Sequence, residues 1–104
     1  MLSDNKKLNT LISKQKKFSN KTFGNPQKCN FKIPLLHLKE EIDEVLSNPD
    51  DKIEWADCLL LFLDAVQRKG FSIENIIDIS HKKLKINKKR VWKKDSNGLY
   101  KHVK

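Results

Sequence analysis

Two pairs of acidic residues, each with members three positions apart, have the types and spacing of a metal site. Glu41 and Glu44 form one pair, Glu54 and Asp57 form the other, and both lie in segments with helical apolar spacing. Residues three apart project from the same side of an α-helix, so each pair presents two carboxylates together. Adjacent carboxylates repel each other unless cations neutralise them, and oxygen-only ligands favour Mg²⁺ or Mn²⁺ over zinc. The pattern therefore predicts a divalent-cation site, which is typical of phosphate-ester chemistry.

Each acidic pair also has an ordinary explanation. Glu54 and Asp57 fall early in a helix, where acids favour the positive end of the helix dipole. Glu40, Glu41 and Glu44 have the spacing of a solvated helical face. The metal interpretation is favoured because the second pair lies in an otherwise apolar helix, where a charge is costly unless it is paired or metal-bound.

Charge is distributed unevenly along the chain. The formal net charge is +9 over 104 residues, yet nine of the 13 acids lie between positions 37 and 64. That stretch has only two basic residues, Lys39 and Lys52, whereas ten of the 22 Lys and Arg residues follow Ser80. Such a basic frame suits a polyanion held against a metal-loaded acidic centre, although many single lysines only solvate the surface.

The length and composition predict one intracellular domain. The longest apolar run, Cys58–Leu63, is too short to span a bilayer, and Met1–Lys17 lacks the apolar stretch of a signal peptide. Cys29 and Cys58 have no metal-ligand spacing and are expected to be free thiols.

Apolar spacing and capping residues predict an all-α chain. The expected helices cover residues 4–19, 33–47, 49–69 and 73–90, with a loop at 21–30 and a polar tail from Val91. Asn48 and Pro49 are expected to begin the third helix, Gly70 to end it, and Ser72 to cap the fourth. In domain terms, we expect one domain, 1–104, with a helix and loop at 1–30, a metal-site core at 31–90 and a tail at 91–104.

The predicted third helix has almost no polar face. Apart from Glu54, Asp57 and Asp64, most residues from Ile53 to Val66 are apolar. Such a helix must be buried nearly all round, and a chain of this size has little material to surround it. We therefore expect a homodimer or a dimer of dimers.

The acidic pattern resembles that of a known family. Glu40-Glu41-x-x-Glu44, followed after nine residues by Glu54-x-x-Asp57, is similar to the EExxE and ExxD motifs of the MazG-like all-α nucleoside triphosphate pyrophosphohydrolases. From about Lys17 the chain further resembles a subgroup described as dATP/dGTP pyrophosphohydrolases of bacteria and phages. The matching segments include Lys21-Thr22-Phe23-Gly24, Glu54-Trp55-Ala56-Asp57, Lys83-x-x-x-Asn87-x-x-Arg90-x-Trp92 and His102-Val103-Lys104. Two departures are Val66-Gln67, where a Gly-Ala-Trp-like stretch is usual, and a short segment after Trp92.

The resemblance implies a fold and an activity. The fold would be a four-helix MazG-like bundle completed by oligomerisation. The activity would be Mg²⁺-dependent hydrolysis of nucleoside triphosphates, dATP or dGTP above all, to the monophosphate and pyrophosphate, with Mn²⁺ as a substitute. Carried over by position, the metal ligands would be Glu41, Glu44, Glu54 and Asp57, and Glu40 would act with Glu41 in catalysis by ligating or by orienting a water.

The resemblance also implies substrate contacts by Lys83, Asn87, Arg90 and Trp92. The first three share one face of the predicted fourth helix, which without the family match would be explained as a basic solvated face. His37, one turn before Glu41, is expected to orient a carboxylate or touch the nucleotide, and an exposed surface histidine is an equal alternative.

Two other function classes fit parts of the sequence. A basic helical module that binds nucleic acid without catalysis would bind with a steep salt dependence and without metal. A structural helical dimer would respond to metal in neither activity nor stability. Neither alternative explains acids inside the most apolar helix, so we expect a cytoplasmic enzyme, in a bacterial cell or a phage-infected host, that requires neither membrane nor nucleic acid.

Overall fold

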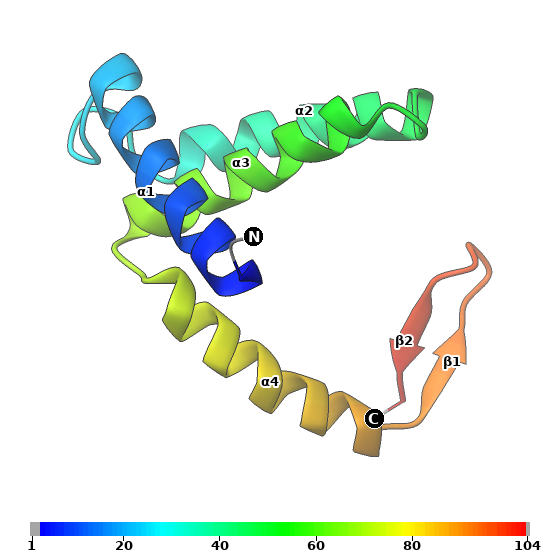
Figure 1. Cartoon of the computed structure of the whole chain (residues 1–104). Coiled ribbons are helices and arrows are strands. Elements are labelled where there is room, and N and C mark those ends of the chain that lie inside the picture. Colours follow the sequence, from blue (N-terminus) through cyan, green and yellow to red (C-terminus); the bar gives the residue numbers. More distant parts are fainter. Residues whose placement is uncertain (1–2, 104) are drawn as a thin grey trace. The chain divides into compact units, whose positions relative to one another are not determined.

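The computed structural model describes residues 3–103 and contains four helices and one small hairpin. The helices are α1 (Asp4–Phe23), α2 (Lys32–Ser47), α3 (Lys52–Lys69) and α4 (Ile73–Lys89), and the hairpin pairs β1 (Trp92–Lys94) with β2 (Tyr100–His102) (Figure 1). The chain divides into two compact units, one ending at Ile73 and one beginning at Glu74. The predicted all-α architecture with four helices is confirmed. Met1, Leu2 and Lys104, the last residue of the closing motif, lie outside the described residues.

The first helix is longer than the sequence predicted. Ser3 caps it by accepting a hydrogen bond from the Lys6 backbone N–H, at 3.2 Å. The expected end at Ser19 is wrong, because the helix continues to Phe23 and stops only at Gly24, whose φ is +95°. Lysine and threonine do not by themselves end a helix, whereas a glycine with positive φ does.

The turn between α2 and α3 corrects a second prediction. Asn48 does not begin α3 but ends α2, and the N-cap is Asp51, whose carboxylate accepts from the Ile53 N–H at 3.0 Å. Pro49 therefore lies in the turn, where its carbonyl accepts a hydrogen bond from Trp55 Nε1 at 2.9 Å. Asparagine and aspartate are both good N-caps, so residue type alone does not choose between Asn48 and Asp51. Asp51 is the N-cap because its carboxylate reaches a free N–H at the start of α3.

Gly70 ends α3 as expected. It lies in the left-handed region at φ +91°, and its N–H donates to the carbonyls of Gln67 and Val66. Arg68 and Lys69 occupy the last turn, where positive charge is favoured. The fourth helix follows at Ile73, directly after Ser72, and ends at Lys89, within the predicted range.

A buried guanidinium joins three segments of the first unit. Arg68 Nε donates to both carboxylate oxygens of Asp64, at 3.1 Å each, and Nη2 donates to Ser19 Oγ at 2.6 Å. Arg68 Nη1 donates to the carbonyls of Gly24 and Cys29, at 2.8 and 2.7 Å. Four of the five N–H groups of the Arg68 side chain therefore donate to acceptors in α1, in α3 and in the loop between α1 and α2.

Only the C-terminal half of α3 is buried within one chain. Leu63, Ala65 and Val66 form the buried apolar core of the described residues, together with the polar residues Ser19, Asp64 and Arg68. In contrast, Trp55 and Phe62 are 56% and 43% exposed. Burial nearly all round is therefore wrong for the single chain, and the expected cover by a second subunit stays a prediction.

The second unit contains a hairpin where the sequence predicted an unpaired polar tail. The register pairs Trp92 with His102 and Lys94 with Tyr100. Asp95 makes the turn by accepting from the N–H groups of Leu99 and Asn97, and these bonds, led by that of Leu99, lower the pKa of its carboxyl. A short aspartate-based turn gives no apolar periodicity, which is why the strands were missed.

No helix within residues 3–103 is long and apolar enough to cross a membrane.

Replacing Arg68 by alanine should destabilise the protein by about 3–5 kcal/mol, because Asp64 would be left as an uncompensated buried charge. Urea unfolding measures this difference. The neighbouring Lys69→Ala, which removes only an exposed contact with the Phe31 ring at 4.7 Å, serves as the control and should cost less than about 1 kcal/mol. Equal stability of the two variants would contradict the proposed role of the buried pair.

Candidate metal centre

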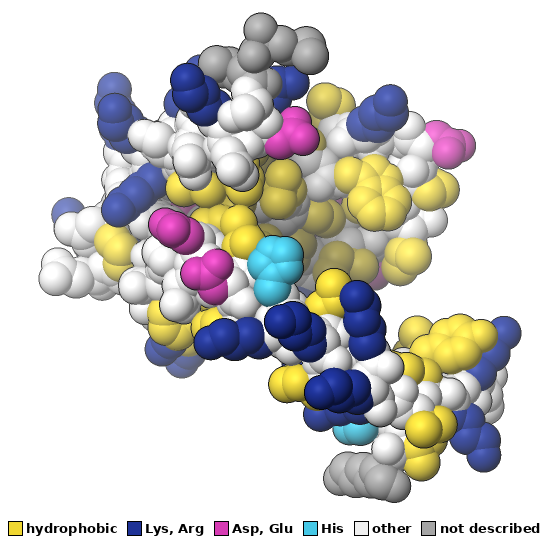
Figure 2. All heavy atoms as spheres, turned by 60° about the horizontal axis from the view of Figure 1, so that its bottom comes forward, with side chains coloured by type: hydrophobic (Ala, Val, Ile, Leu, Met, Phe, Trp, Pro, Cys, Tyr) yellow, Lys and Arg dark blue, Asp and Glu magenta, His cyan; other side chains and the backbone are white. Residues whose placement is uncertain are grey.

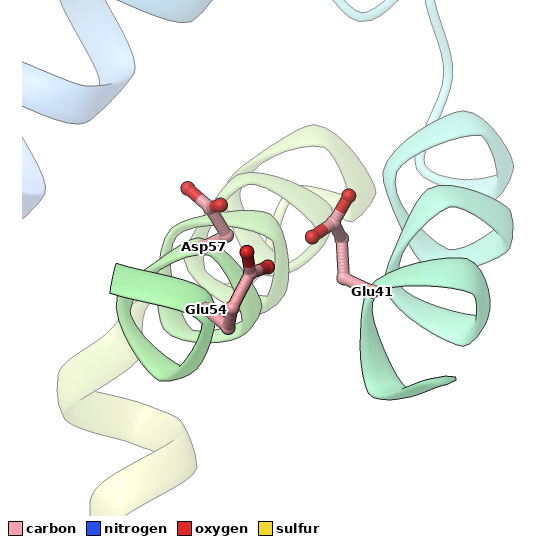
Figure 3. A group of neighbouring side chains, drawn as sticks. All are labelled: Glu41, Glu54 and Asp57. Carbon is pink, nitrogen blue, oxygen red and sulfur yellow. The ribbon is translucent and has the colours of Figure 1, made fainter. Parts of the chain in front are cut away.

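The antiparallel packing of α2 and α3 brings three of the predicted ligands together. Glu41 projects from α2 toward Glu54 and Asp57, which project from α3 (Figure 3). One carboxylate oxygen from each residue lies within 4.8 Å of the other two, and all three side chains are half-buried. The three-residue spacing places Glu54 and Asp57 on one side of α3. The short turn before α3, whose N-cap is Asp51, brings α2 alongside, so that Glu41 reaches the same point.

The electrostatics of this cluster match a cation site. Partial burial, followed by the charges of Glu41 and Glu44, raises the pKa of the Glu54 carboxyl. Burial, followed by the charge of Glu41, also raises the pKa of the Cys58 thiol. Unrelieved repulsion among oxygen donors, with no neighbouring thiolate, is the donor chemistry that suits a hard divalent cation.

Glu44 and Glu40 lie differently from the other acids. Glu44 is exposed and outside the group of three, although its charge acts on Glu54. Glu40 is also exposed and lines a separate hollow on α2 with Leu36 and Asp43. The structure thus brings together Glu41, Glu54 and Asp57 and places Glu40 on another part of the α2 surface.

His37 contacts the cluster directly. Its Nε2 lies 3.3 Å from Glu41 Oε1, and its side chain is 54% exposed, compared with 19% for Glu41. This is the carboxylate-orienting position that the sequence allowed for His37. A ring nitrogen bonded to a ligand carboxylate fixes the direction of that carboxylate.

A cavity of about 250 Å³ lies against the acids. Glu41 and Asp57 form one part of its lining, while Gln15, Phe18 and Phe23 of α1 form another. The sequence analysis did not single out Gln15 or Phe18. Neither residue belongs to a motif, and only the packing of α1 on α3 places them next to the carboxylates.

The remaining predicted substrate residues belong to the second unit. Trp92 Nε1 donates to the Asn87 carbonyl at 2.8 Å, and the Trp92 ring packs edge-on against His102. Arg90 Nη1 lies 3.4 Å from His102 Nδ1, while Lys83 is exposed. Asn87 Oδ1 is buried and has no hydrogen-bond partner among the described residues. Lys and Arg side chains gather over α4 (Figure 2).

Comparison with known proteins agrees with the acidic motif. Residues 11–104 match the sequence profile of the family described as dATP/dGTP pyrophosphohydrolase. The chain belongs to the dATP/dGTP pyrophosphohydrolase family. This confirms the resemblance that the two acidic pairs and the C-terminal motif indicated.

Curated relatives of this family member come from phages. The chain is 34% identical over 70 residues to a dATP/dGTP diphosphohydrolase of Salmonella phage PMBT28. This match covers 66% of the chain and 23% of the phage protein. The chain is also 42% identical over 52 residues to the Eaa protein of Salmonella phage P22. That match covers 50% of the chain and 16% of the Eaa protein. The chain therefore spans less than a quarter of the length of these relatives.

A solved structure has the same fold over nearly the whole chain. It is the MazG-like pyrophosphohydrolase of cyanophage S-2L, bound to dGDP and three catalytic Mn²⁺ ions per active site. The TM-score is 0.73 at 26% identity, and the match covers 91% of this chain and 95% of the cyanophage chain.

Replacing Glu54 by glutamine should raise the melting temperature of the metal-free protein near neutral pH. Because the folded-state pKa of Glu54 is raised, its ionisation disfavours the fold once the pH rises through that value. Below the unfolded pKa, about 4.3, both states are neutral and the advantage of the variant should vanish. Thermal unfolding in EDTA at about pH 4 and about pH 7.5 measures both effects.

The control for this comparison is Asp43→Asn, which removes an exposed acid from α2. Mn²⁺ should raise the melting temperature of the wild type and of the Asp43 variant, and should have little effect on the Glu54 variant. An equal response of all three proteins would contradict the assignment of Glu54 to the metal centre.

Proposed function

We propose that this chain hydrolyses purine deoxynucleoside triphosphates, dATP and dGTP, between the α and β phosphates. The products are the deoxynucleoside monophosphate and pyrophosphate, the working cation is Mg²⁺, and Mn²⁺ can replace it. The observation that carries the proposal is the convergence of Glu41, Glu54 and Asp57 from two helices at one point. The named phage relatives support the substrate class. The proposed location of the reaction is the cytoplasm of an infected bacterium.

The chain contributes ligands and orientation rather than a covalent nucleophile. Glu41, Glu54 and Asp57 hold the cation, with Glu44 completing the set from the exposed side of α2. A bound Mg²⁺ or Mn²⁺ would neutralise the triphosphate and polarise the scissile phosphorus. His37 fixes the direction of the Glu41 carboxylate through their 3.3 Å contact. Glu41 orients or deprotonates the attacking water. Glu40, which lines a separate hollow on α2, can assist only if its side chain turns toward the cluster.

The second unit supplies groups that suit a triphosphate and a sugar. Arg90 and Lys83 stabilise negative charge on the phosphates, since basic side chains act on charge that develops during phosphoryl transfer. Asn87 Oδ1, which is buried and unpartnered among the described residues, is an acceptor suited to the 3′-hydroxyl of a deoxyribose. Trp92 holds the backbone of Asn87 in place through its indole N–H.

Incubation with Mg²⁺ and dATP or dGTP should yield monophosphate and pyrophosphate. Glu41→Gln, Glu54→Gln and Asp57→Asn should each lower kcat/KM by more than about 100-fold, because even the partners of metal ligands contribute 10–100-fold. Separation of the products by anion-exchange chromatography measures both the cleavage position and the rate. Release of diphosphate and phosphate, or full turnover in EDTA, would contradict the proposal.

The same assay includes two further variants. Arg90→Ala should lower kcat/KM by about tenfold or more if the second unit contacts the phosphates, and the division between kcat and KM reports whether the contact forms only in the transition state. Lys94→Ala, an exposed strand lysine, is the matched control and should retain wild-type activity.

We further propose that the enzyme is a homo-oligomer, dimer or tetramer, in which exposed apolar residues of α3 face a second copy. Leu59 and Phe62 are 47% and 43% exposed, so α3 leaves apolar area in water that a second copy could cover. Leu60, which lies between them in the sequence, lines the cavity beside the acids instead.

Light scattering should give a mass at least twice that of the 12.2 kDa chain at low micromolar concentration. Phe62→Lys should shift the protein toward monomer, because a lysine ammonium is costly to bury at an apolar interface. Leu99→Lys, a substitution of an exposed apolar residue in the hairpin, should leave the mass unchanged. A folded wild-type monomer at these concentrations would rule out the oligomer.

A further inference from the structure

The lining of the cavity beside the acids combines two kinds of side chain. Glu41 and Asp57 belong to the metal centre, and His37 and Asp64 are the other ionisable residues of the lining. The apolar part of the lining comes from Phe18 and Phe23 of α1 and from Leu60 and Leu61 of α3. A pocket that is mostly apolar, with a few fixed polar groups, is the usual environment for the flat part of a small ligand. A molecule with phosphates at one end and an aromatic ring at the other would fit this polarity.

The two phenylalanine rings are available for stacking. Phe18 and Phe23 are 57% and 55% exposed, and they pack edge to face with centroids 5.9 Å apart. Rings left this open at a cavity wall gain apolar contact when a flat ring covers them. Stacking on an aromatic side chain tolerates every base, since every base has a π-face, so these rings supply affinity and little selection.

Selection between bases requires a polar group in the lining, and Gln15 provides one. Its Nε2 donates to the Leu60 carbonyl at 3.4 Å, and this bond fixes which amide atom faces α3. Gln15 Oε1 has no hydrogen-bond partner within residues 3–103, and the residue lines the cavity. One turn further along α1, Ser19 Oγ donates to Asp64 at 2.6 Å and holds the helix in this register on α3.

We propose that the cavity receives the base of the nucleotide and that Gln15 Oε1 accepts a hydrogen bond from the exocyclic amino group of a purine. Adenine carries this amino group at C6 and guanine at C2, so one acceptor serves either base in different orientations. Gln15 is then a specificity-determining residue of the hydrolytic site. The inference rests on the proposed function, because the nucleotide must have its phosphates at the Glu41 and Asp57 end.

Deoxyinosine triphosphate tests this assignment, because hypoxanthine has neither amino group but is otherwise a purine. For the wild type, kcat/KM should be about fivefold to tenfold lower with this substrate than with the better of dATP and dGTP, the value of one hydrogen bond. In Gln15→Met, which keeps the length of the side chain, the three substrates should differ by less than about twofold. Gln27→Met, in the loop after α1, is the matched control and should keep the wild-type ratios.

Three results would separate the possible failures. If the wild type hydrolyses deoxyinosine triphosphate with the same kcat/KM as dATP and dGTP, the role of the amino group is overturned. Unchanged ratios in Gln15→Met, and also in Gln15→Ala if the first variant unfolds early, would overturn the assignment to Gln15 alone. If the wild type releases pyrophosphate from none of the three substrates, the proposed function is overturned instead.

Discussion

The buried ion pair between Arg68 and Asp64, in which one N–H group is shared by both carboxylate oxygens, is the interaction on which the rest of the first unit depends. The guanidinium is fully buried, and its remaining N–H groups bind Ser19 and the carbonyls of Gly24 and Cys29. The apolar core beside it is small, so these charge-assisted bonds fix where α1 and the following loop lie on α3. This attachment, together with the hydrogen bonds of Gln15 to Leu60 and of Gln67 to Asn20, holds the part of α1 that lines the cavity next to the carboxylates.

The metal centre has the opposite energetic character. Whereas Arg68 compensates Asp64, no basic side chain among the described residues pairs with Glu54 or Asp57, and the pKa of Glu54 is raised by burial and by its acidic neighbours. Such repulsion disfavours the metal-free fold and favours any state in which cations occupy the cluster. On α3 the buried Asp64 thus lies about two to three turns from Asp57 and Glu54. Asp64 is paired within the chain, whereas Asp57 and Glu54 are left open to a ligand.

The sequence predicted the four helices and the approach of three of the four acids, since both depend on local spacing. Four helices and the Gly70 stop follow from periodicity and capping, and Glu41, Glu54 and Asp57 meet because a short turn joins their helices. Tertiary choices were not predictable. Asp51 and Asn48 are similarly favourable N-cap residues, so residue type does not show which one begins α3. Nothing in the motif marks Arg68 as the partner of Asp64 or Gln15 as part of a cavity.

The net charge of +9 conceals two regions of opposite charge, to which the proposed function assigns different roles toward a triphosphate. Positions 37–64 contain nine acids and two basic residues other than His37, while positions 74–104 contain ten basic residues and three acids. An acidic centre without cations repels a polyanion, so long-range attraction must come from the basic unit, and close binding must wait until the carboxylates are neutralised. A single charge sign could not do both, because the groups that hold a divalent cation and the groups that attract the phosphates must have opposite charge.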